Sequence, residues 1–208
     1  SPAFERKDVQ FALACLAREI STGSTCGFID VGANIGAFTV KMALQGRDKL
    51  KTWAFEPVPQ NLEILYENLK LNAIDAEKVK VFPYALSDKS GEFPMVYAWT
   101  HSGAATLDFH GTDSNTIRVQ THRGDDVLEG LPDSLILKID VEGHEIKVLG
   151  GMKNKLAGKG CWLCIEDIFD REKLYDYLNN FGFQFHSKFT PYNSWWKLRS
   201  KTKGLAQC

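Results

Sequence analysis

The chain has 208 residues, of which 25 are Lys or Arg and 26 are Asp or Glu, so its formal net charge is −1. This balance gives no electrostatic reason to expect nucleic acid or an acidic membrane surface as a partner. No apolar run approaches the roughly 18 to 20 residues of a membrane-spanning helix, and the N-terminus lacks the pattern of a secretion signal. We therefore expect one soluble, cytoplasmic domain over residues 1–208, long enough to bury a continuous core.

Apolar periodicity alternates between helix and strand, which is typical of an α/β protein. The first predicted helix covers 7–20, where Val9, Leu13, Leu16 and Ile20 form one apolar stripe. The pattern then predicts strand 28–31, helix 35–45, strand 51–55, helix 59–72 and strand 79–84.

The alternation is interrupted between residues 93 and 122. Strands 96–99 and 116–120 flank a loop rich in Gly, Ser and Asp, which predicts an inserted β-hairpin over one end of the sheet. The alternation resumes with strand 135–139, helix 144–157, strand 161–165 and helix 170–181. Segments 183–185 and 195–198 are expected to close the sheet as an antiparallel pair, with one of Trp195 and Trp196 in the core.

Five cysteines are scattered among apolar neighbours: Cys15, Cys26, Cys161, Cys164 and Cys208. Cys161 and Cys164 have the spacing of a redox or zinc motif, but they fall in a predicted buried strand, without a second pair of ligands at zinc spacing. We interpret the cysteines as reduced core residues.

The turn between strand 28–31 and helix 35–45 carries two glycines. Gly32 can adopt the positive φ of a tight turn, and Gly36 lacks the Cβ atom that would block a ligand or the facing strand. The helix that follows Asn34 offers unpaired N–H groups. The turn therefore predicts a site for a nucleotide-like molecule, although two glycines alone are weak evidence.

An acid follows the next predicted strand. Glu56 stands 20 residues after Gly36, the spacing at which an acid meets ribose hydroxyls in dinucleotide-binding folds. Its charge would repel a 2′-phosphate, which argues against NADP. An NAD-dependent oxidoreductase stays an alternative, although Asn34 stands where the dinucleotide motif has its second glycine.

Acids also follow other predicted strands. Asp30, Asp140 and the pair Glu166-Asp167 join Glu56 at the carboxyl ends, where ligands bind in an open α/β sheet. Converging carboxylates repel one another and lose hydration, so function is the better explanation of the set than folding.

The string Lys138-Ile139-Asp140-Val141-Glu142-Gly143-His144-Glu145 is the most selective motif of the chain. Together with segments 29–36, 54–61 and 85–88, it resembles the FkbM family of S-adenosylmethionine-dependent methyltransferases, over residues 28 to about 166. The resemblance implies a Rossmann-like class I methyltransferase fold: a seven-stranded, mostly parallel sheet with an antiparallel last strand. It also implies methyl transfer, usually to a hydroxyl oxygen.

The resemblance implies S-adenosylmethionine (SAM) as the cofactor. The implied cofactor-binding residues are Asp30, Gly32, Asn34, Gly36, Glu56, Pro57, Ala85, Leu86 and Asp140. Within this set, Glu56 would accept both ribose hydroxyls, and adenine would lie near Tyr84, Ala85 and Leu86. Asp140 would face the methyl end of the cofactor.

The implied catalytic residues are Asp140, Glu142 and His144. Methyl transfer to oxygen needs an in-line approach and removal of the hydroxyl proton. We expect Glu142 to orient the acceptor or take the proton; His144 is either an alternative base or a surface residue at a helix N-terminus. Lys138 either forms a buried ion pair or contacts the methionine carboxylate of the cofactor. Glu145 is interpreted as a favourable charge in a first helical turn.

Two further alternatives stay open. In the first, Asp140, Glu166 and Asp167 have the placement of a magnesium site in catechol-type O-methyltransferases. In the second, the chain is a cofactor-binding module that has lost its activity. The expected acceptor is a hydroxyl of a saccharide, a glycolipid or a small-molecule natural product. Residues of the insertion that would suit a sugar ring are Trp99, His101, Ser102, Thr106 and His110.

Overall fold

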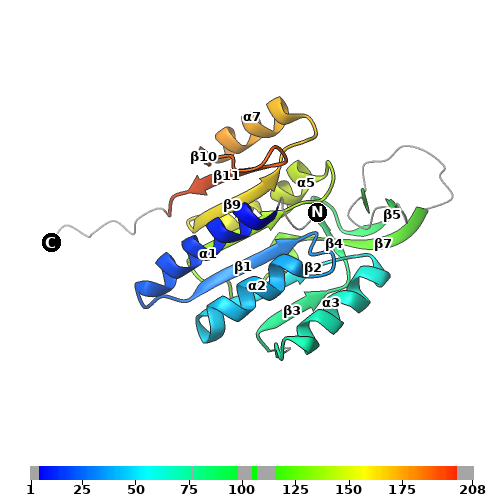
Figure 1. The fold of residues 1–208 in the computed structure, drawn as a ribbon. Helices are drawn as coiled ribbons and strands as arrows, with labels where there is room; N and C mark the ends of the chain where they lie inside the picture. Colours follow the sequence, from blue (N-terminus) through cyan, green and yellow to red (C-terminus); the bar gives the residue numbers. More distant parts are fainter. Residues whose placement is uncertain (1–4, 76, 98–104, 107–115, 201–208) are drawn as a thin grey trace.

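The computed structural model describes residues 5–75, 77–97, 105–106 and 116–200 (Figure 1). Its main sheet has seven strands in the order β10-β11-β9-β8-β1-β2-β3. The strands are β1 (Cys26–Val31), β2 (Leu50–Phe55), β3 (Val79–Phe82), β8 (Ser134–Ile139), β9 (Gly160–Glu166), β10 (Gln184–Ser187) and β11 (Asn193–Leu198). Only β11 runs antiparallel to its two neighbours, β9 and β10. The predicted mostly parallel sheet with an antiparallel last strand is confirmed.

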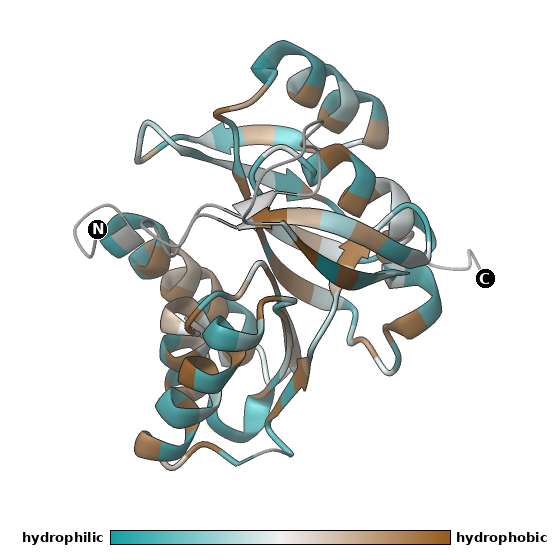
Figure 2. Ribbon diagram, turned by 90° about the vertical axis from the view of Figure 1, so that its right-hand side faces the viewer, coloured by the Kyte–Doolittle hydropathy of each residue, from teal (hydrophilic) through white to brown (hydrophobic). Residues whose placement is uncertain are grey.

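Helices cover both faces of this sheet (Figure 1). One face carries α1 (Glu5–Ser21), α2 (Ala37–Gly46) and α3 (Pro59–Leu71), and the other carries α5 (Glu145–Gly151), α6 (Lys153–Leu156) and α7 (Arg171–Phe181). Short helical turns η1 (Arg47–Lys49) and α4 (Gly124–Val127) complete the set. Figure 2 shows both hydrophilic and hydrophobic residues on these helices, as expected when one side of each helix meets a sheet.

Neighbouring residues of the central strands enter different cores. Phe28 packs with α1 and α2, whereas Ile29 packs with α5 and the segment that follows it. Trp195 and Trp196 divide in the same way, and both are buried. The expectation that one of these tryptophans is core was too narrow, because β11 is covered on both faces.

The insertion is larger than the predicted hairpin. β4 (Ala85–Ser87), β5 (Gly91–Tyr97), β6 (Ala105–Thr106) and β7 (Thr116–Arg123) form a second sheet in the order β4-β7-β5-β6. The antiparallel pairing of β5 with β7 is confirmed, but β4 joins it in parallel. Strand 79–84 is therefore too long as predicted, since the chain leaves the main sheet after Phe82. Trp99, His101, Ser102 and His110 lie outside the described residues.

The predicted helix 144–157 is also divided. α5 ends at Gly151, and α6 begins at Lys153. A Cβ atom on Gly151 would lie 1.9 Å from the carbonyl oxygen of Ser87. The helix breaks where its backbone meets β4, a contact between distant segments that helical periodicity does not report.

The described cysteines fit the interpretation as reduced core residues. Cys15, Cys26, Cys161 and Cys164 are buried and form no disulfide. Burial raises the pKa of each of these thiols, so none is an activated thiolate. Cys208 lies outside the described residues.

No helix within the described ranges has both the length and the apolar composition required to cross a membrane.

The two glycines of the β1–α2 turn are required by contacts within the protein. Gly32 has φ +78°, and a Cβ atom there would lie 2.0 Å from the carbonyl oxygen of Asp140 at the end of β8. Gly36 has φ +80°, and its Cβ atom would lie 2.6 Å from Leu65 Cδ1 on α3. The first glycine therefore lets the turn approach β8, and the second lets α2 approach α3.

The close approach at Gly32 predicts a large loss of stability for Gly32→Ala. The matched control is Gly23→Ala, because Gly23 has a similar φ of +84° but a Cβ atom added to it would meet no atom within 4 Å. We expect Gly23→Ala to lower the free energy of unfolding by about 1–2 kcal/mol, because of its left-handed backbone alone. Gly32→Ala should lower it by about 1–3 kcal/mol more, because the added Cβ atom overpacks the turn. Urea unfolding of both variants measures the difference; equal losses would contradict the close approach.

Candidate active site

A cavity of about 660 Å³ lies at the carboxyl ends of β1, β2, β8 and β9. It is the place where an open α/β sheet binds ligands. A larger cavity, of about 910 Å³, lies at the other end of these strands, beside Ser134 and Gly160. None of the predicted site residues lines that larger cavity, so we place the candidate site at the carboxyl ends.

Nine of the predicted site residues line the cavity: Gly32, Asn34, Glu56, Pro57, Ala85, Leu86, Asp140, Glu142 and His144. Asp30 and Gly36, which the resemblance also implies for cofactor binding, do not line it. Asp30 lies beneath the cavity with no exposed surface, and Gly36 faces α3. Tyr84 does not line it either, because its ring packs against His122 and Phe82.

Glu56 lies at the end of β2, and only 4% of its surface is exposed. Its Oε2 atom accepts a hydrogen bond of 2.8 Å from the backbone N–H of Asn34, while Oε1 accepts from the Val58 N–H and the Asn61 side chain. Burial raises the pKa of Glu56, and these donors oppose the rise. A carboxylate has about four acceptor positions, so one stays available on Oε2, and a second requires Asn61 to release Oε1.

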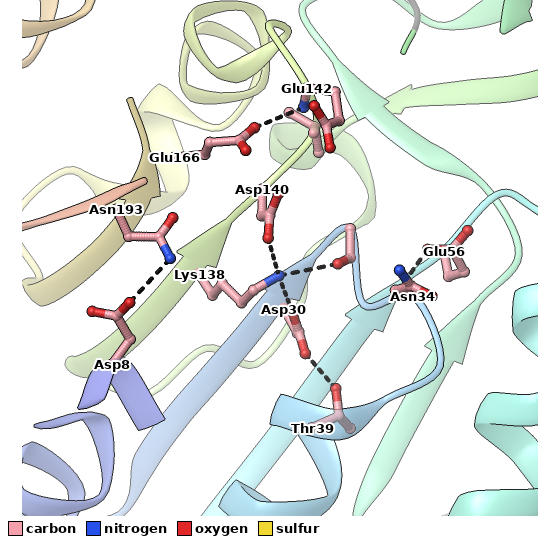
Figure 3. Close-up of polar contacts among 12 residues, drawn as sticks. Asp8, Asp30, Asn34, Thr39, Glu56, Lys138, Asp140, Glu142, Glu166 and Asn193 are labelled. Atoms are coloured by element: carbon pink, nitrogen blue, oxygen red, sulfur yellow. Dashed lines mark hydrogen bonds and ion pairs between the residues drawn. The ribbon is translucent and has the colours of Figure 1, made fainter. Parts of the chain in front are cut away.

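Lys138 forms a buried ion pair, as one of its two predicted roles requires. Its Nζ atom lies 3.6 Å from Asp30 Oδ1 and 3.3 Å from Asp140 Oδ2, and it donates to the Gly32 carbonyl oxygen at 3.1 Å (Figure 3). Thr39 of α2 donates to the other oxygen of Asp30 at 2.6 Å. Asp30 therefore supports the site from below, and Lys138 joins β8 to the turn that follows β1.

Three carboxylates meet on the β8–β9 side of the cavity. One oxygen from each of Asp140, Glu142 and Glu166 lies within 4.8 Å of the others. The pKa of Glu166 is raised to about 9, first by burial and then by the charges of Asp140 and Glu142. The pKa of Glu142 is raised by burial first and by Asp140 second. Desolvated carboxylates that repel one another favour proton transfer or cation binding.

Asp167 does not belong to this group, although the magnesium alternative named it together with Asp140 and Glu166. Its side chain is fully buried and accepts from Tyr175 and Lys188. Neighbouring residues of a strand point to opposite faces, which turns Asp167 away when Glu166 faces the cavity. Glu142 takes its place in the set.

The turn after β8 is held by Glu145. Glu142 has φ +55°, a left-handed conformation that is uncommon outside glycine. Glu145 Oε1 accepts from the backbone N–H groups of Val141 and Gly143, and Glu166 Oε2 accepts from that of Glu142. Glu145 is buried, which raises its pKa to about 7. It does more than place a charge in a first helical turn, because it fixes the backbone that carries Glu142.

His144 is not a surface residue, so that interpretation is corrected. Only 5% of its surface is exposed, and its Nε2 atom lies 2.9 Å from Ser87 Oγ. Ser87 in turn donates to Asp88 at 3.2 Å. His144 thus lines the cavity while its ring is held by β4.

The sequence prediction missed one wall of the cavity. Thr190, Tyr192 and Asn193, at the start of β11 and just before it, line the cavity together with Glu166. Asp8 of α1 binds two of them from behind. Asp8 shares a buried helical stripe with Ala12 and Cys15. A charged residue within an apolar stripe could have drawn attention to Asp8 in the sequence. No comparable sequence feature marks Thr190, Tyr192 or Asn193.

Residues 30–185 match the family model described as Methyltransferase FkbM domain. This chain belongs to the FkbM methyltransferase family.

Two curated relatives resemble this FkbM-family chain. It is 33% identical over 132 residues to hexuronic acid methyltransferase AglP of Haloferax volcanii, covering 61% of this chain and 50% of the relative. It is 32% identical over 156 residues to methyltransferase sdnD of Sordaria araneosa, covering 60% of this chain and 59% of the relative. The chain thus spans only about half to three fifths of the length of these relatives.

Solved structures show the same fold. The methyltransferase FkbM of Methylobacillus flagellatus superposes with a TM-score of 0.59 at 17% identity, over 84% of this chain and 44% of that one. Magnesium protoporphyrin IX methyltransferase of Synechocystis, solved with bound SAM, gives a TM-score of 0.53 at 11% identity, over 94% and 79%. The FkbM-family chain therefore has the Rossmann-like class I methyltransferase fold.

The raised pKa of Glu166 predicts the pH dependence of stability. The pKa rises from 4.5 to about 9 on folding, so between these values the folded protein holds a proton that the unfolded chain releases. The free energy of unfolding should therefore fall as pH rises from about 5 to 9.

Glu166→Gln stays neutral and should flatten this fall, so it should melt above wild type at pH 8.5. Thermal melts across the pH range, with EDTA present, measure the effect, and exposed Glu63→Gln is the control. If melting temperature depends on pH in the same way in wild type and in Glu166→Gln, the raised pKa of Glu166 is contradicted.

Proposed function

We propose that the chain is a SAM-dependent O-methyltransferase that methylates a hydroxyl group of a saccharide, glycolipid or small-molecule natural product. The observation that carries the proposal is the shared cavity: Glu56 at the end of β2 and the three carboxylates beside β8 line the same space. The family membership of residues 30–185 supports it.

The residues of the cavity fit SAM. Glu56 keeps an acceptor position for a ribose hydroxyl, and hydrogen bonds to charged groups are the stronger kind. Ala85 and Leu86 give an apolar surface suited to adenine, and Asn34 replaces the glycine that a pyrophosphate would need. The negative charges of Asp140 and Glu142 favour a sulfonium cation. This arrangement favours SAM over NAD.

The catalytic proposal concerns proton removal and charge. When bound, SAM supplies a methyl group on a positively charged sulfur, and transfer breaks the S–C bond as the O–C bond forms. Glu142 takes the hydroxyl proton, because burial and Asp140 raise its pKa above that of an ordinary glutamate and so strengthen it as a base. His144 is the alternative base, since it lines the same cavity.

The acceptor class follows from polar and apolar groups at the cavity mouth. Ile168 and Tyr192 line the cavity and are each more than 40% exposed. Glu142 offers hydrogen-bond acceptors, and the protonated Glu166 offers a donor and an acceptor. A ring that carries hydroxyl groups matches both surfaces, since its apolar face can lie on Tyr192. The name of one relative, hexuronic acid methyltransferase, refers to a sugar acid, a hydroxylated compound that agrees with this class.

Binding of S-adenosylhomocysteine (SAH) tests the donor site. We expect SAH to bind and raise the melting temperature, and NAD to leave it unchanged. Glu56→Gln should weaken SAH binding by about 10- to 100-fold, because the amide directs N–H groups at the Asn34 N–H and at the ribose. Calorimetry measures both affinities, with Glu63→Gln as the control.

The enzymatic part requires transfer of a labelled methyl group from SAM to a panel of methyl glycosides and glycolipids. Stabilisation by NAD alone would contradict the proposal. Binding of SAH without transfer to any acceptor would favour the inactive-module alternative.

A metal-assisted reaction is the second candidate, because the oxygens of Asp140, Glu142 and Glu166 lie close enough together to bind one cation. We expect transfer to stay within about twofold of its initial rate after dialysis against EDTA, since Glu142 already provides a base. Loss of activity that Mg²⁺ or Mn²⁺ restores would instead establish the metal-assisted reaction.

A further inference from the structure

Asn193 stands at the end of the cavity farthest along the sheet from Glu56. In the strand order, β11 and β2 lie on opposite sides of β8. Asn193 is the first residue of β11, and it lies directly across the β9–β11 ladder from Glu166. Residues that face each other in this way share one side of the sheet. Asn193 therefore belongs with the carboxylates rather than with the ribose site.

Asp8 holds this residue from behind. Its carboxylate has no exposed surface and accepts three hydrogen bonds: from Trp195 Nε1 at 2.7 Å, from Asn193 Nδ2 at 3.1 Å and from Thr190 Oγ1 at 3.3 Å. Within the part of the chain that the structure describes, no Lys, Arg or His lies in ion-pair contact with it. A buried carboxylate without a cation depends on such donors.

An ionised carboxylate only accepts hydrogen bonds. Asn193 must therefore turn its NH₂ group to Asp8, and its carbonyl oxygen Oδ1 faces away from α1. Figure 3 shows this oxygen on the side of Asn193 where Asp140 and Glu166 lie. Asn193 also lines the cavity. The orientation of the amide is thus set by the chemistry of Asp8.

Thr190 fixes the backbone at the same place. Its hydroxyl donates to Asp8 and accepts from the backbone N–H of Asn193 at 3.1 Å. Asn193 is therefore held through both its side chain and its backbone. With the carboxylate of Glu142, its oxygen gives this wall hydrogen-bond acceptors. These acceptors suit a ligand that brings hydroxyl donors.

We propose that Asn193 Oδ1 accepts a hydrogen bond from a second, unmethylated hydroxyl of the methyl acceptor, and that Asp8 is the positioning residue that orients it. This inference rests on the function proposed above and specifies its substrate as a ring with at least two hydroxyl groups. Asp8 acts only through Asn193 and Thr190, and contacts no part of the acceptor.

The test compares acceptors that differ by one hydroxyl. Wild type, Asp8→Asn and Asn193→Ala are assayed with the methyl glycoside that wild type methylates fastest, and with each of its monodeoxy analogues. For one analogue we expect wild type to lose about 10- to 100-fold in kcat/KM, as when a site built for a hydroxyl loses it. In both variants, removing the same hydroxyl from the acceptor should lower kcat/KM by less than about threefold.

Glu19→Gln is the matched control. Glu19 lies on the same helix α1 and accepts from Ser134 Oγ at 2.7 Å, at the opposite end of the strands. Glu19→Gln should show the same ratio of kcat/KM between the full acceptor and its monodeoxy analogue as wild type. The affinity for SAH should be the same in all four proteins, because the ribose side of the cavity is unchanged. A purely structural defect would instead lower the rate on every acceptor equally.

Asn193→Ala keeps the test valid if Asp8→Asn does not fold, because Asn193 is only half-buried. Equal discrimination in wild type and Asn193→Ala overturns the inference. A wild type that binds SAH but methylates no hydroxylated glycoside also overturns it, and leaves the donor site standing. A wild type that binds no SAH overturns the proposed function as well.

Discussion

The ammonium group of Lys138 is the interaction on which the site depends. It lies between Asp30 of β1 and Asp140 after β8, and it donates to the Gly32 carbonyl oxygen between them. An uncompensated buried charge costs about 3–5 kcal/mol, so Lys138 is needed to keep Asp30 in the core. The same contact draws the β1–α2 turn to the end of β8, and thereby sets one carboxylate beside the space that Glu56 reaches from β2.

This contact also explains how far the sequence could predict the molecule. Strand periodicity was enough for the order of elements in the sheet, because strands alternate regularly. The nine cavity residues came from the family-like segments 29–36, 54–61, 85–88 and 138–145, which stand at strand ends along one edge. The direction in which a single side chain points was harder to predict from the sequence. Asp30 and Asp167 also stand near strand ends, but neither lines the cavity. Each is held by a lysine distant in sequence, Lys138 for Asp30 and Lys188 for Asp167.

The remaining errors have a similar cause. The helix 144–157 was divided because Gly151 meets the carbonyl of Ser87, and His144 was buried because β4 comes to lie against it. Both effects arise from the second sheet, whose strand β4 begins only three residues after β3 ends. Local periodicity describes how a segment buries its own apolar face, and does not report which distant backbone will lie against it.

The network of Asp8, Thr190 and Asn193 has a consequence for how the chain divides its tasks. These residues precede position 30 or follow position 185, whereas Glu56, Lys138 and Asp140 lie within the segment that matches the family. Under the proposed function, the segment that matches the family supplies the donor side of the cavity together with Glu142 and Glu166. The two flanking segments meet in space to hold Asn193. Acceptor selectivity could then change through these flanking segments while the donor side is kept.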